Sequence, residues 1–179
     1  AGAVLVDLST MTRILDINLE DMTVTVEAGV TWKQLYETLR EKGVRTPFWG
    51  PLSGISSTIG GGLSQNNAIF GAGIYGPTSD SVTSLTVVLA DGTVLRTGSA
   101  ATRGASPFWR HYGPDLTGIF LGDTGALGFK AEATFRLIRL PAAERWASFE
   151  FQSFEACTKA SSAIAREGLA CELFGFDPV

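Results

Sequence analysis

The sequence predicts an α+β fold in which a mixed β-sheet is flanked by helices. The prediction rests on two hairpin-like pairs of alternating segments, at residues 13–29 and 81–98, and on helical apolar spacing over residues 31–43. A long alternating run over residues 126–140 adds a further strand. With 179 residues, of which 45% are hydrophobic and 18% charged, the chain can bury a substantial core.

The first part of the chain is expected to contain a strand, a hairpin and a helix, in that order. The sequence AVLVDL at residues 3–8 is typical of a buried strand, and residues 13–20 and 21–29 alternate on either side of a tight turn. Thr31 is suited to cap a helix over residues 31–43, because its hydroxyl can accept a hydrogen bond from a free amide of the first turn.

Residues 46–77 have a different character, because proline, glycine, serine and asparagine dominate and regular periodicity is weak. A loop of this length inside a compact domain is usually functional or disordered. Its apolar residues, among them Phe48, Trp49 and Leu63, favour an ordered and functional segment. A short helix is expected to begin near Thr58.

The next part of the chain contains the clearest hairpin, at residues 81–98, where two β-rich runs meet at Asp91-Gly92. A short helix is expected within residues 114–122, before the strand at 126–140. The apolar faces of the expected strands and helices together predict a core, which consists of Val4, Val6, Val24, Val26, Leu35, Leu39, Leu85, Val87, Leu89, Leu127 and Leu137.

A domain boundary is expected at Pro141. Residues 1–141 then form one domain, and residues 142–179 begin a second. That second part reads as a strand at 145–152, a helix at 153–168 capped by a serine, and a last strand or loop. This pattern is too short to close a fold of its own, so we expect the second domain to be cut short.

Composition excludes several classes of function. The net charge of −4 argues against a nucleic-acid partner, which needs a basic face. No apolar run approaches the roughly 20 residues of a membrane-spanning helix. The N-terminus lacks a signal-peptide pattern, so a cytoplasmic location is expected. Cys157 and Cys171 lack metal-ligand spacing; two buried thiols are favoured over a disulfide, which stays an alternative.

The chain shows no self-contained catalytic machinery. His111 is the only histidine, no cluster of potential ligands has metal spacing, and no nucleophile–base set can be assembled. The glycine-rich segment 54–67 (GISSTIGGGLSQNN) contains hydroxyls and amides but no charged side chain. Such a segment can hold a ligand through its backbone, although three glycines alone also suit a plain flexible turn. A second glycine cluster, at residues 122–129, is open to the same two interpretations.

Taken in order, these blocks resemble a known family. The segments 3–43, STIGGGLSQN, YGPTSDSVTSLTVVLADGTVLRTG and GPDLTGIFLGDTGALGFKAEATFRLI are similar to the FAD-binding domain of the vanillyl-alcohol oxidase/p-cresol methylhydroxylase superfamily. The similarity is to the FAD-linked oxidase branch, which includes D-lactate dehydrogenases and glycolate oxidase flavoprotein subunits. The resemblance covers residues 3–141. It implies the second of two FAD subdomains, without the first, followed by the start of a substrate (cap) domain.

The resemblance also implies which residues contact FAD. They match the second FAD loop, the chain that follows it and the turn before the last strand: Leu52, Ser53, Gly54, Ser57, Thr58, Gly60, Gly61, Asn66, Asn67, Ala68, Thr124, Gly125, Ala126, Leu127, Gly128 and Phe129. The chain departs from the family pattern at Leu52, which lacks an acidic residue before it, at Leu63 and at Thr124. His111 matches no covalent flavin attachment motif, so non-covalent FAD is expected.

The function implied by the resemblance is an FAD-dependent oxidoreductase that oxidises a small 2-hydroxy acid or a related alcohol by hydride transfer. The cofactor carries the redox chemistry and the protein positions it. The substrate base is expected in the cap domain, so the sequence names no catalytic residue, no metal and no electron acceptor. One alternative is a flavin-dependent non-redox transferase resembling alkylglycerone-phosphate synthase. A plain interaction domain is another. This chain alone is expected to hold FAD weakly and to be inactive.

Overall fold

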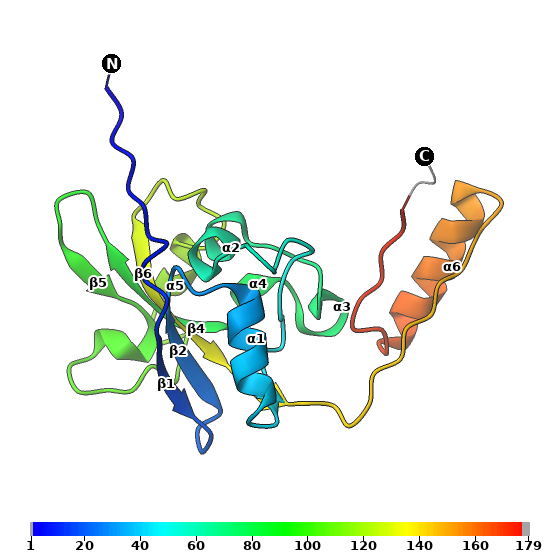
Figure 1. Ribbon diagram of the computed structural model, residues 1–179, viewed down its shortest axis with the longest axis horizontal. Coiled ribbons are helices and arrows are strands. Elements are labelled where there is room, and N and C mark those ends of the chain that lie inside the picture. The colour runs from blue at the N-terminus through cyan, green and yellow to red at the C-terminus, as the bar shows by residue number, and fades with distance from the viewer. Residues whose placement is uncertain (1, 177–179) are drawn as a thin grey trace.

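The computed structural model describes residues 2–176, and its centre is a five-stranded sheet (Figure 1). The strands lie in the order β1 (Ile14–Asn18), β2 (Thr23–Glu27), β6 (Phe129–Arg136), β4 (Val82–Val88) and β5 (Val94–Arg96). Each neighbouring pair in this sheet is antiparallel. The α+β class is confirmed, and the sheet expected to be mixed is antiparallel in its described strands. Both predicted hairpins are present as β1–β2 and β4–β5.

Helix α1 (Trp32–Arg40) lies against this sheet, as its apolar spacing predicts. Thr31 is its N-cap, since the Thr31 hydroxyl accepts a hydrogen bond from the Gln34 amide at 3.1 Å. Trp32 packs edge-on against Phe48 and Phe135, with ring centroids 5.1 and 5.7 Å apart. These aromatic contacts fix the helix over the strands on which the candidate site is built.

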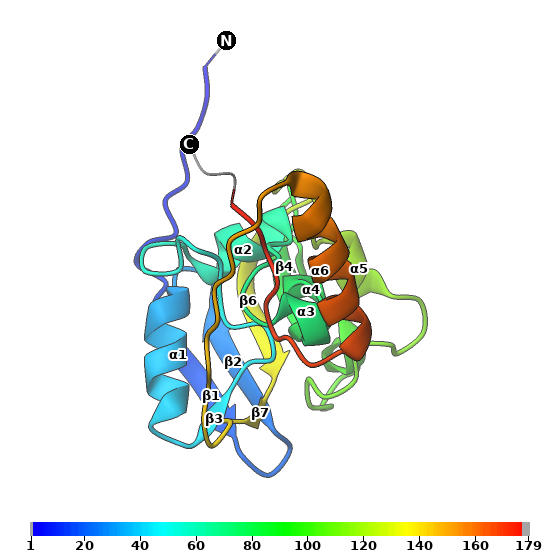
Figure 2. The ribbon, with the colours of Figure 1, turned by 90° about the vertical axis from the view of Figure 1, so that its right-hand side faces the viewer.

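The glycine-rich stretch 46–77 is ordered and contains short helices. They are α2 (Ile59–Gln65), α3 (Ala72–Tyr75) and α4 (Thr78–Ser81, continuing into β4). The start of α2 is where the sequence predicts it: the Thr58 hydroxyl accepts a hydrogen bond from the Gly61 amide at 3.3 Å. Figures 1 and 2 show α2 beside β6. A short loop helix, α5 (Leu116–Ile119), confirms the helix expected within 114–122, and a 3₁₀ turn, η1 (Gly98–Ala101), follows β5.

The core between the sheet and the helices contains most of the predicted residues. Val24, Val26, Leu35, Leu39, Leu85, Val87 and Leu137 are buried in one cluster, and Leu89 packs against it half-buried. Each fully buried aliphatic side chain of this kind contributes about 1.5–3 kcal/mol relative to an exposed one. The three remaining predictions are wrong: Val4 is 91% exposed, Val6 48% and Leu127 50%.

The errors at Val4 and Val6 come from the predicted strand at 3–8. Residues 2–8 are extended but pair with no described strand, and the segment projects away from the sheet (Figure 1). Apolar character alone does not supply the neighbour that an extended segment needs for its hydrogen bonds. After a turn in which the Met11 amide donates to the Leu8 carbonyl at 3.0 Å, the chain joins the domain at Met11, whose carbonyl accepts a hydrogen bond from the Gly29 amide at 2.8 Å.

The long strand predicted at 126–140 is shorter and broken. It starts only at Phe129, because residues 122–128 form a turn that leaves Leu127 exposed. It ends at Arg136, where the Leu137 amide donates to the Met22 carbonyl. The chain then forms β7 (Ile138–Arg139), which pairs with β3 (Val44–Arg45) in a separate two-stranded sheet.

The last part of the chain lies apart from the sheet. Helix α6 (Phe154–Glu167) confirms the predicted helix, with Ser153 as N-cap and Gly168 as C-cap. The strand predicted at 145–152 is absent: this stretch is exposed and unpaired, because no described strand lies beside it (Figure 1). Residues 169–176 form no strand, and the end of that prediction lies outside the described residues.

Cys157 and Cys171 are free thiols, each half-buried, so the disulfide alternative does not hold. Among the helices described within residues 2–176, none has the length and apolar content needed to cross a membrane.

Candidate functional site

The two glycine clusters of the sequence meet at one cleft of about 370 Å³, here called the glycine cleft. Its lining comes from the N-terminal segment, the chain after β2, the start of α2 and the turn before β6. The lining residues are Val6, Asp7, Leu8, Ser9, Ala28, Gly29, Thr58, Gly60, Gly61, Ser64, Gly125, Gly128, Phe129 and Lys130. Segments about 60 residues apart in the sequence therefore form a single concave surface.

The start of α2 is held tightly against the chain after β2. The Ile59 amide donates to the Val30 carbonyl and the Gly60 amide to the Ala28 carbonyl, both at 2.8 Å. A Cβ on Gly60 would lie 3.0 Å from the Cβ of Ala28, so this close approach favours glycine. A Cβ on Gly61 would meet only the Thr58 hydroxyl, at 3.4 Å. Gly60 thus serves packing, whereas Gly61 is open to the glycine cleft.

The turn before β6 is shaped by Asp123. Its carboxylate accepts hydrogen bonds from the Gly125 amide at 2.9 Å and the Leu127 amide at 3.2 Å. Thr124 and Gly125 both have left-handed backbone conformations, with φ of 54° and 82°. A Cβ on Gly128 would lie 2.6 Å from Cγ1 of Val87. The turn therefore packs against β4 while its Gly125 side stays open.

Backbone hydrogen bonds join this turn to α2. The Gly122 amide donates to the Leu63 carbonyl and the Thr124 amide to the Ser64 carbonyl, each at 2.9 Å. The hydroxyl of Ser64 in turn donates to the Gly60 carbonyl at 2.9 Å. Both glycine clusters consequently belong to one continuous wall.

A buried ion pair lies at the base of the same wall. Nζ of Lys130 is 2.6 Å from Oδ1 of Asp123, and each side chain is only 2% exposed. Burial acts to raise the pKa of Asp123, but the hydrogen bonds from Lys130 and from two amides outweigh it, so this pKa lies below its ordinary value. Asp123 is therefore held ionised, and Lys130 completes the pair.

The structure brings only part of the predicted site to the glycine cleft. Thr58, Gly60, Gly61, Gly125, Gly128 and Phe129 line it. The other predicted residues lie outside its lining: Leu52, Ser53, Gly54, Ser57, Asn66, Asn67, Ala68, Thr124, Ala126 and Leu127.

Several of these outer residues have structural roles. Asn66 ends α2 in a left-handed conformation and accepts a hydrogen bond from the Ser79 amide at 3.0 Å. The Asn67 carbonyl accepts hydrogen bonds from the Thr78 amide and hydroxyl, both at 2.8 Å. The two asparagines therefore fasten α2 to α4.

Sequence reasoning missed the charged and hydroxyl residues of the lining, among them Asp7, Ser9, Ser64 and Lys130. For Lys130 a signal was present, since Asp123 and Lys130 lie seven positions apart on either side of Gly125 and Gly128. This signal was overlooked because the predicted binding site consisted of uncharged backbone groups alone.

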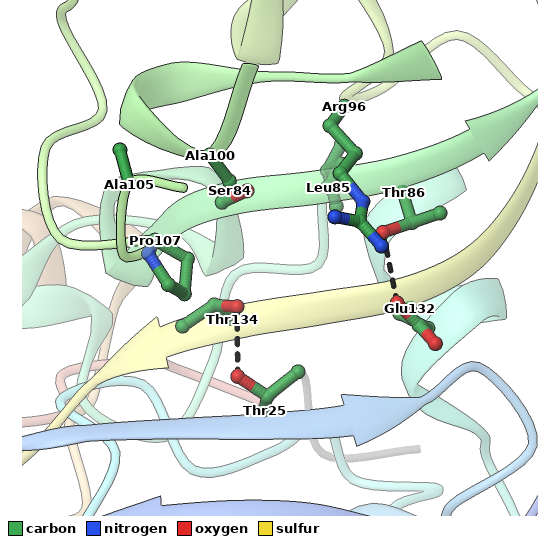
Figure 3. Close-up of a pocket in the computed structure, with 10 residues that line it drawn as sticks. All are labelled: Thr25, Ser84, Leu85, Thr86, Arg96, Ala100, Ala105, Pro107, Glu132 and Thr134. Carbon is green, nitrogen blue, oxygen red and sulfur yellow. Dashed lines mark hydrogen bonds between the residues drawn. The ribbon is translucent and has the colours of Figure 1, made fainter. Parts of the chain in front are cut away.

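A second, smaller cavity of about 130 Å³ lies over the β2, β6 and β4 strands (Figure 3). Its polar groups largely satisfy one another. The hydroxyls of Thr25 and Thr134 are 3.0 Å apart, and the Thr86 hydroxyl donates to Glu132 at 2.9 Å. This cavity is also the smaller of the two and is lined by neither glycine cluster.

The lining of the glycine cleft can bind but offers little for catalysis by itself. It combines glycine backbone, the hydroxyl residues Ser9, Thr58 and Ser64, and the oppositely charged residues Asp7 and Lys130. His111 is exposed in a loop outside this lining. Within residues 2–176, no three His, Cys, Asp or Glu side chains are grouped so that they could hold a metal ion. Such a surface suits a polar ligand that brings its own chemistry.

Comparison with known proteins gives consistent matches. The model of a family described as "FAD binding domain" matches residues 1–98. The chain is 34% identical over 169 residues to probable mitochondrial D-lactate dehydrogenase of Danio rerio, covering 94% of this chain and 33% of that protein. It is 33% identical over 154 residues to glycolate oxidase subunit GlcD of Bacillus subtilis, covering 86% and 31%.

A third relative is mitochondrial D-lactate dehydrogenase [cytochrome] of Arabidopsis thaliana, 39% identical over 140 residues, which are 78% of this chain and 23% of that one. A solved structure of alkyldihydroxyacetonephosphate synthase superposes with a TM-score of 0.61 at 27% identity, covering 74% of this chain and 22% of that one. The chain thus spans about a third or less of the length of these relatives.

Proposed function

Because this chain belongs to the FAD binding domain family, and to its FAD-linked oxidase branch, we propose that the whole protein oxidises a small 2-hydroxy acid or a related alcohol by hydride transfer to non-covalent FAD. The observation that carries the proposal is the single wall formed by both glycine clusters in the glycine cleft. The relatives named as D-lactate dehydrogenase and glycolate oxidase support the substrate class.

FAD is the cofactor of this family, and the lining of the glycine cleft fits it. The hydroxyls and open glycine backbone offer hydrogen bonds without bulky side chains, and Lys130 offers a positive charge. FAD, when bound, supplies the hydride acceptor. Thr58, Gly61, Gly125 and Phe129 would hold it, whereas Gly60 and Gly128 keep the wall close-packed. The expected contacts outside the cleft lining stay predictions.

For domain organisation we propose that residues 1–141 are the second part of the FAD-binding domain and residues 142–179 the beginning of a substrate domain. The position of α6 away from the sheet supports this division (Figure 1). The substrate base then belongs to protein beyond this chain, so we assign no catalytic residue here. The isolated chain is accordingly proposed to bind FAD weakly and to be inactive. A cytoplasmic location stays a prediction, and two of the relatives are named as mitochondrial.

A second candidate function is a flavin-dependent transferase without net oxidation. The structural match to alkyldihydroxyacetonephosphate synthase favours it. The two functions differ in electron balance, because only the oxidoreductase transfers electrons from its substrate to an added dye.

The experiment is anaerobic mixing of the whole, flavin-loaded protein with D-lactate or glycolate. The proposed oxidoreductase bleaches its flavin absorption with one of these or a related 2-hydroxy acid, and then reduces a dye. Flavin that stays oxidised with a panel of 2-hydroxy acids and alcohols would contradict the proposal and favour the transferase.

A further inference from the structure

We propose that Lys130 is the residue that sets a positive charge against the anionic diphosphate of FAD in the glycine cleft, and that Asp123 is the positioning residue that holds its ammonium there. The inference rests on the proposed binding of FAD in this cleft and adds which part of FAD Lys130 faces and how Asp123 positions the lysine. Four observations carry it: a strand irregularity, the hydrogen bonds of the pair, its placement, and the charges of the lining.

A bulge in β6 gives Lys130 its direction. Thr86 pairs with Glu132, but the next residue of β4, Val87, pairs with Lys130, so Ala131 is extra in β6. Side chains alternate between the faces of a strand, and one extra residue reverses that alternation. Lys130 therefore shares a face with core residue Val87 rather than with Glu132. Without the bulge, the lysine would lie on the opposite face of the sheet.

The hydrogen bonds of the ion pair are unequal. Asp123 accepts from Lys130 at 2.6 Å and also from the amides of Gly125 and Leu127. Among residues 2–176, the Lys130 ammonium has Asp123 as its one hydrogen-bond acceptor. The carboxylate thus accepts three hydrogen bonds, whereas the ammonium makes one and has two further N–H groups to donate.

The pair is placed with Lys130, and not Asp123, among the residues that line the glycine cleft. Because both side chains are 2% exposed, water screens their charges poorly and the field of the nearer charge acts strongly in the cleft. A purely structural pair would not require this placement, and buried ion pairs are weak evidence for stability in any case.

The charges of the lining identify which part of FAD this cation suits. Lys130 is the one cation of the lining and Asp7 its one anion, and the Asp7 carboxylate accepts a hydrogen bond from the Ser9 amide at 2.8 Å. The diphosphate of FAD is anionic, whereas its oxidised ring system is neutral. A charge-assisted hydrogen bond to a diphosphate oxygen is roughly twice as strong as a neutral one. The diphosphate is therefore the preferred partner of Lys130.

The test measures binding of FAD, ADP and riboflavin to the whole protein after its flavin has been removed. ADP carries the diphosphate without the ring system, and riboflavin the ring system without the diphosphate. Lys130→Met is expected to weaken FAD and ADP by about tenfold or more, as for loss of a charged hydrogen bond, and to leave riboflavin unchanged. Lys130→Arg keeps the charge and should retain most of the affinity.

Two further variants separate binding from folding. Asp123→Asn/Lys130→Met removes both charges together, which avoids an unpaired buried carboxylate; it should retain the parent's melting temperature within a few degrees and lose FAD affinity as Lys130→Met does. Lys33→Met removes an exposed lysine of α1 and is the matched control, with unchanged affinity. Unchanged FAD affinity in the double variant, or a riboflavin loss as large as the FAD loss, would overturn the proposal.

Failure of this inference is distinguishable from failure of the proposed function. If the parent protein binds FAD and oxidises a hydroxy acid but Lys130→Met binds FAD equally well, only the role of Lys130 is refuted. If the parent binds no FAD at all, the cofactor assignment itself is refuted.

Discussion

At the residue scale, the buried positions of the sheet determine whether the site can form. Val87 is fully buried in the core and lies opposite Lys130, the residue at the base of the glycine cleft. The core packing of this one valine and the placement of the cleft cation therefore depend on the same strand pair. Substitutions here should act on stability first and on ligand binding through it.

Replacement of Val87 by aspartate is expected to cost several kcal/mol of unfolding free energy, because it buries a carboxylate with no partner. Chemical denaturation of the 179-residue chain measures this. Val94→Asp is the matched control: Val94 lies on the edge strand β5 and is largely exposed, so its free energy of unfolding should change by less than about 1 kcal/mol. A Val87→Asp chain that unfolds like the parent would contradict the assignment of this strand to the core.

Asp123 should make the chain acid-sensitive. Its folded pKa lies below the ordinary value of 3.8, so its ionised form stabilises the fold above that pH. That contribution is lost as the pH falls from about 4 through the folded pKa. Melting temperatures measured between about pH 6 and about pH 2.5 should fall less steeply with decreasing pH for Asp123→Asn than for the parent. Asp16→Asn, at an exposed position, is the control and should show the same fall as the parent. An equal fall in melting temperature for Asp123→Asn and the parent would contradict the ion pair.

At the element scale, locally encoded elements were predictable and the cleft was not. The β1–β2 hairpin, α1 with its Thr31 cap and α6 with its Ser153 cap follow from periodicity and capping residues within each segment. The strands expected at 3–8 and 145–152 failed because a strand also needs a partner, which the segment itself does not specify. Likewise, glycine spacing indicates two open turns, but only tertiary hydrogen bonds such as Gly122 to Leu63 join them.

Two glycine substitutions should separate the packing role of the wall from its binding role. Gly128→Ala places a Cβ 2.6 Å from Val87 Cγ1, so the turn or β4 must shift, at a cost of about 1–3 kcal/mol of stability. Gly61→Ala has room for its Cβ and lies within α2, so stability should be unchanged or raised by about 0.5–1 kcal/mol.

FAD titration of the whole protein completes the comparison. Gly61→Ala is expected to weaken FAD binding despite its intact fold, because the added methyl group enters the glycine cleft. Equal FAD affinity in Gly61→Ala and parent would show that this face of α2 does not contact the cofactor.

At the scale of the whole molecule, the chain divides into a packed body and an extended C-terminal part. The exposed side chains of the latter include large aromatic residues, among them Trp146, Phe149 and Phe154. Contacts to the body exist, such as the ion pair of Arg45 with Glu144 at 2.9 Å and the edge-on packing of Trp146 on Phe70. The packed core, however, lies within residues 24–137.

A chain ending at residue 141 should therefore keep a single cooperative thermal transition. Its melting temperature should fall by a few degrees, because Arg45 loses Glu144 and Phe70 loses Trp146. Calorimetry of the two chains side by side measures this. A broad, non-cooperative transition in the shorter chain would contradict the division at residue 141.

The most direct measurement of the central claim is the visible absorption spectrum of the whole protein purified without added cofactor. The glycine cleft and the family predict a yellow protein that releases FAD, not covalently bound flavin, when it is denatured. A colourless protein that remains colourless and binds no FAD after the cofactor is added would contradict the account, and the joined glycine turns would then have a structural role only.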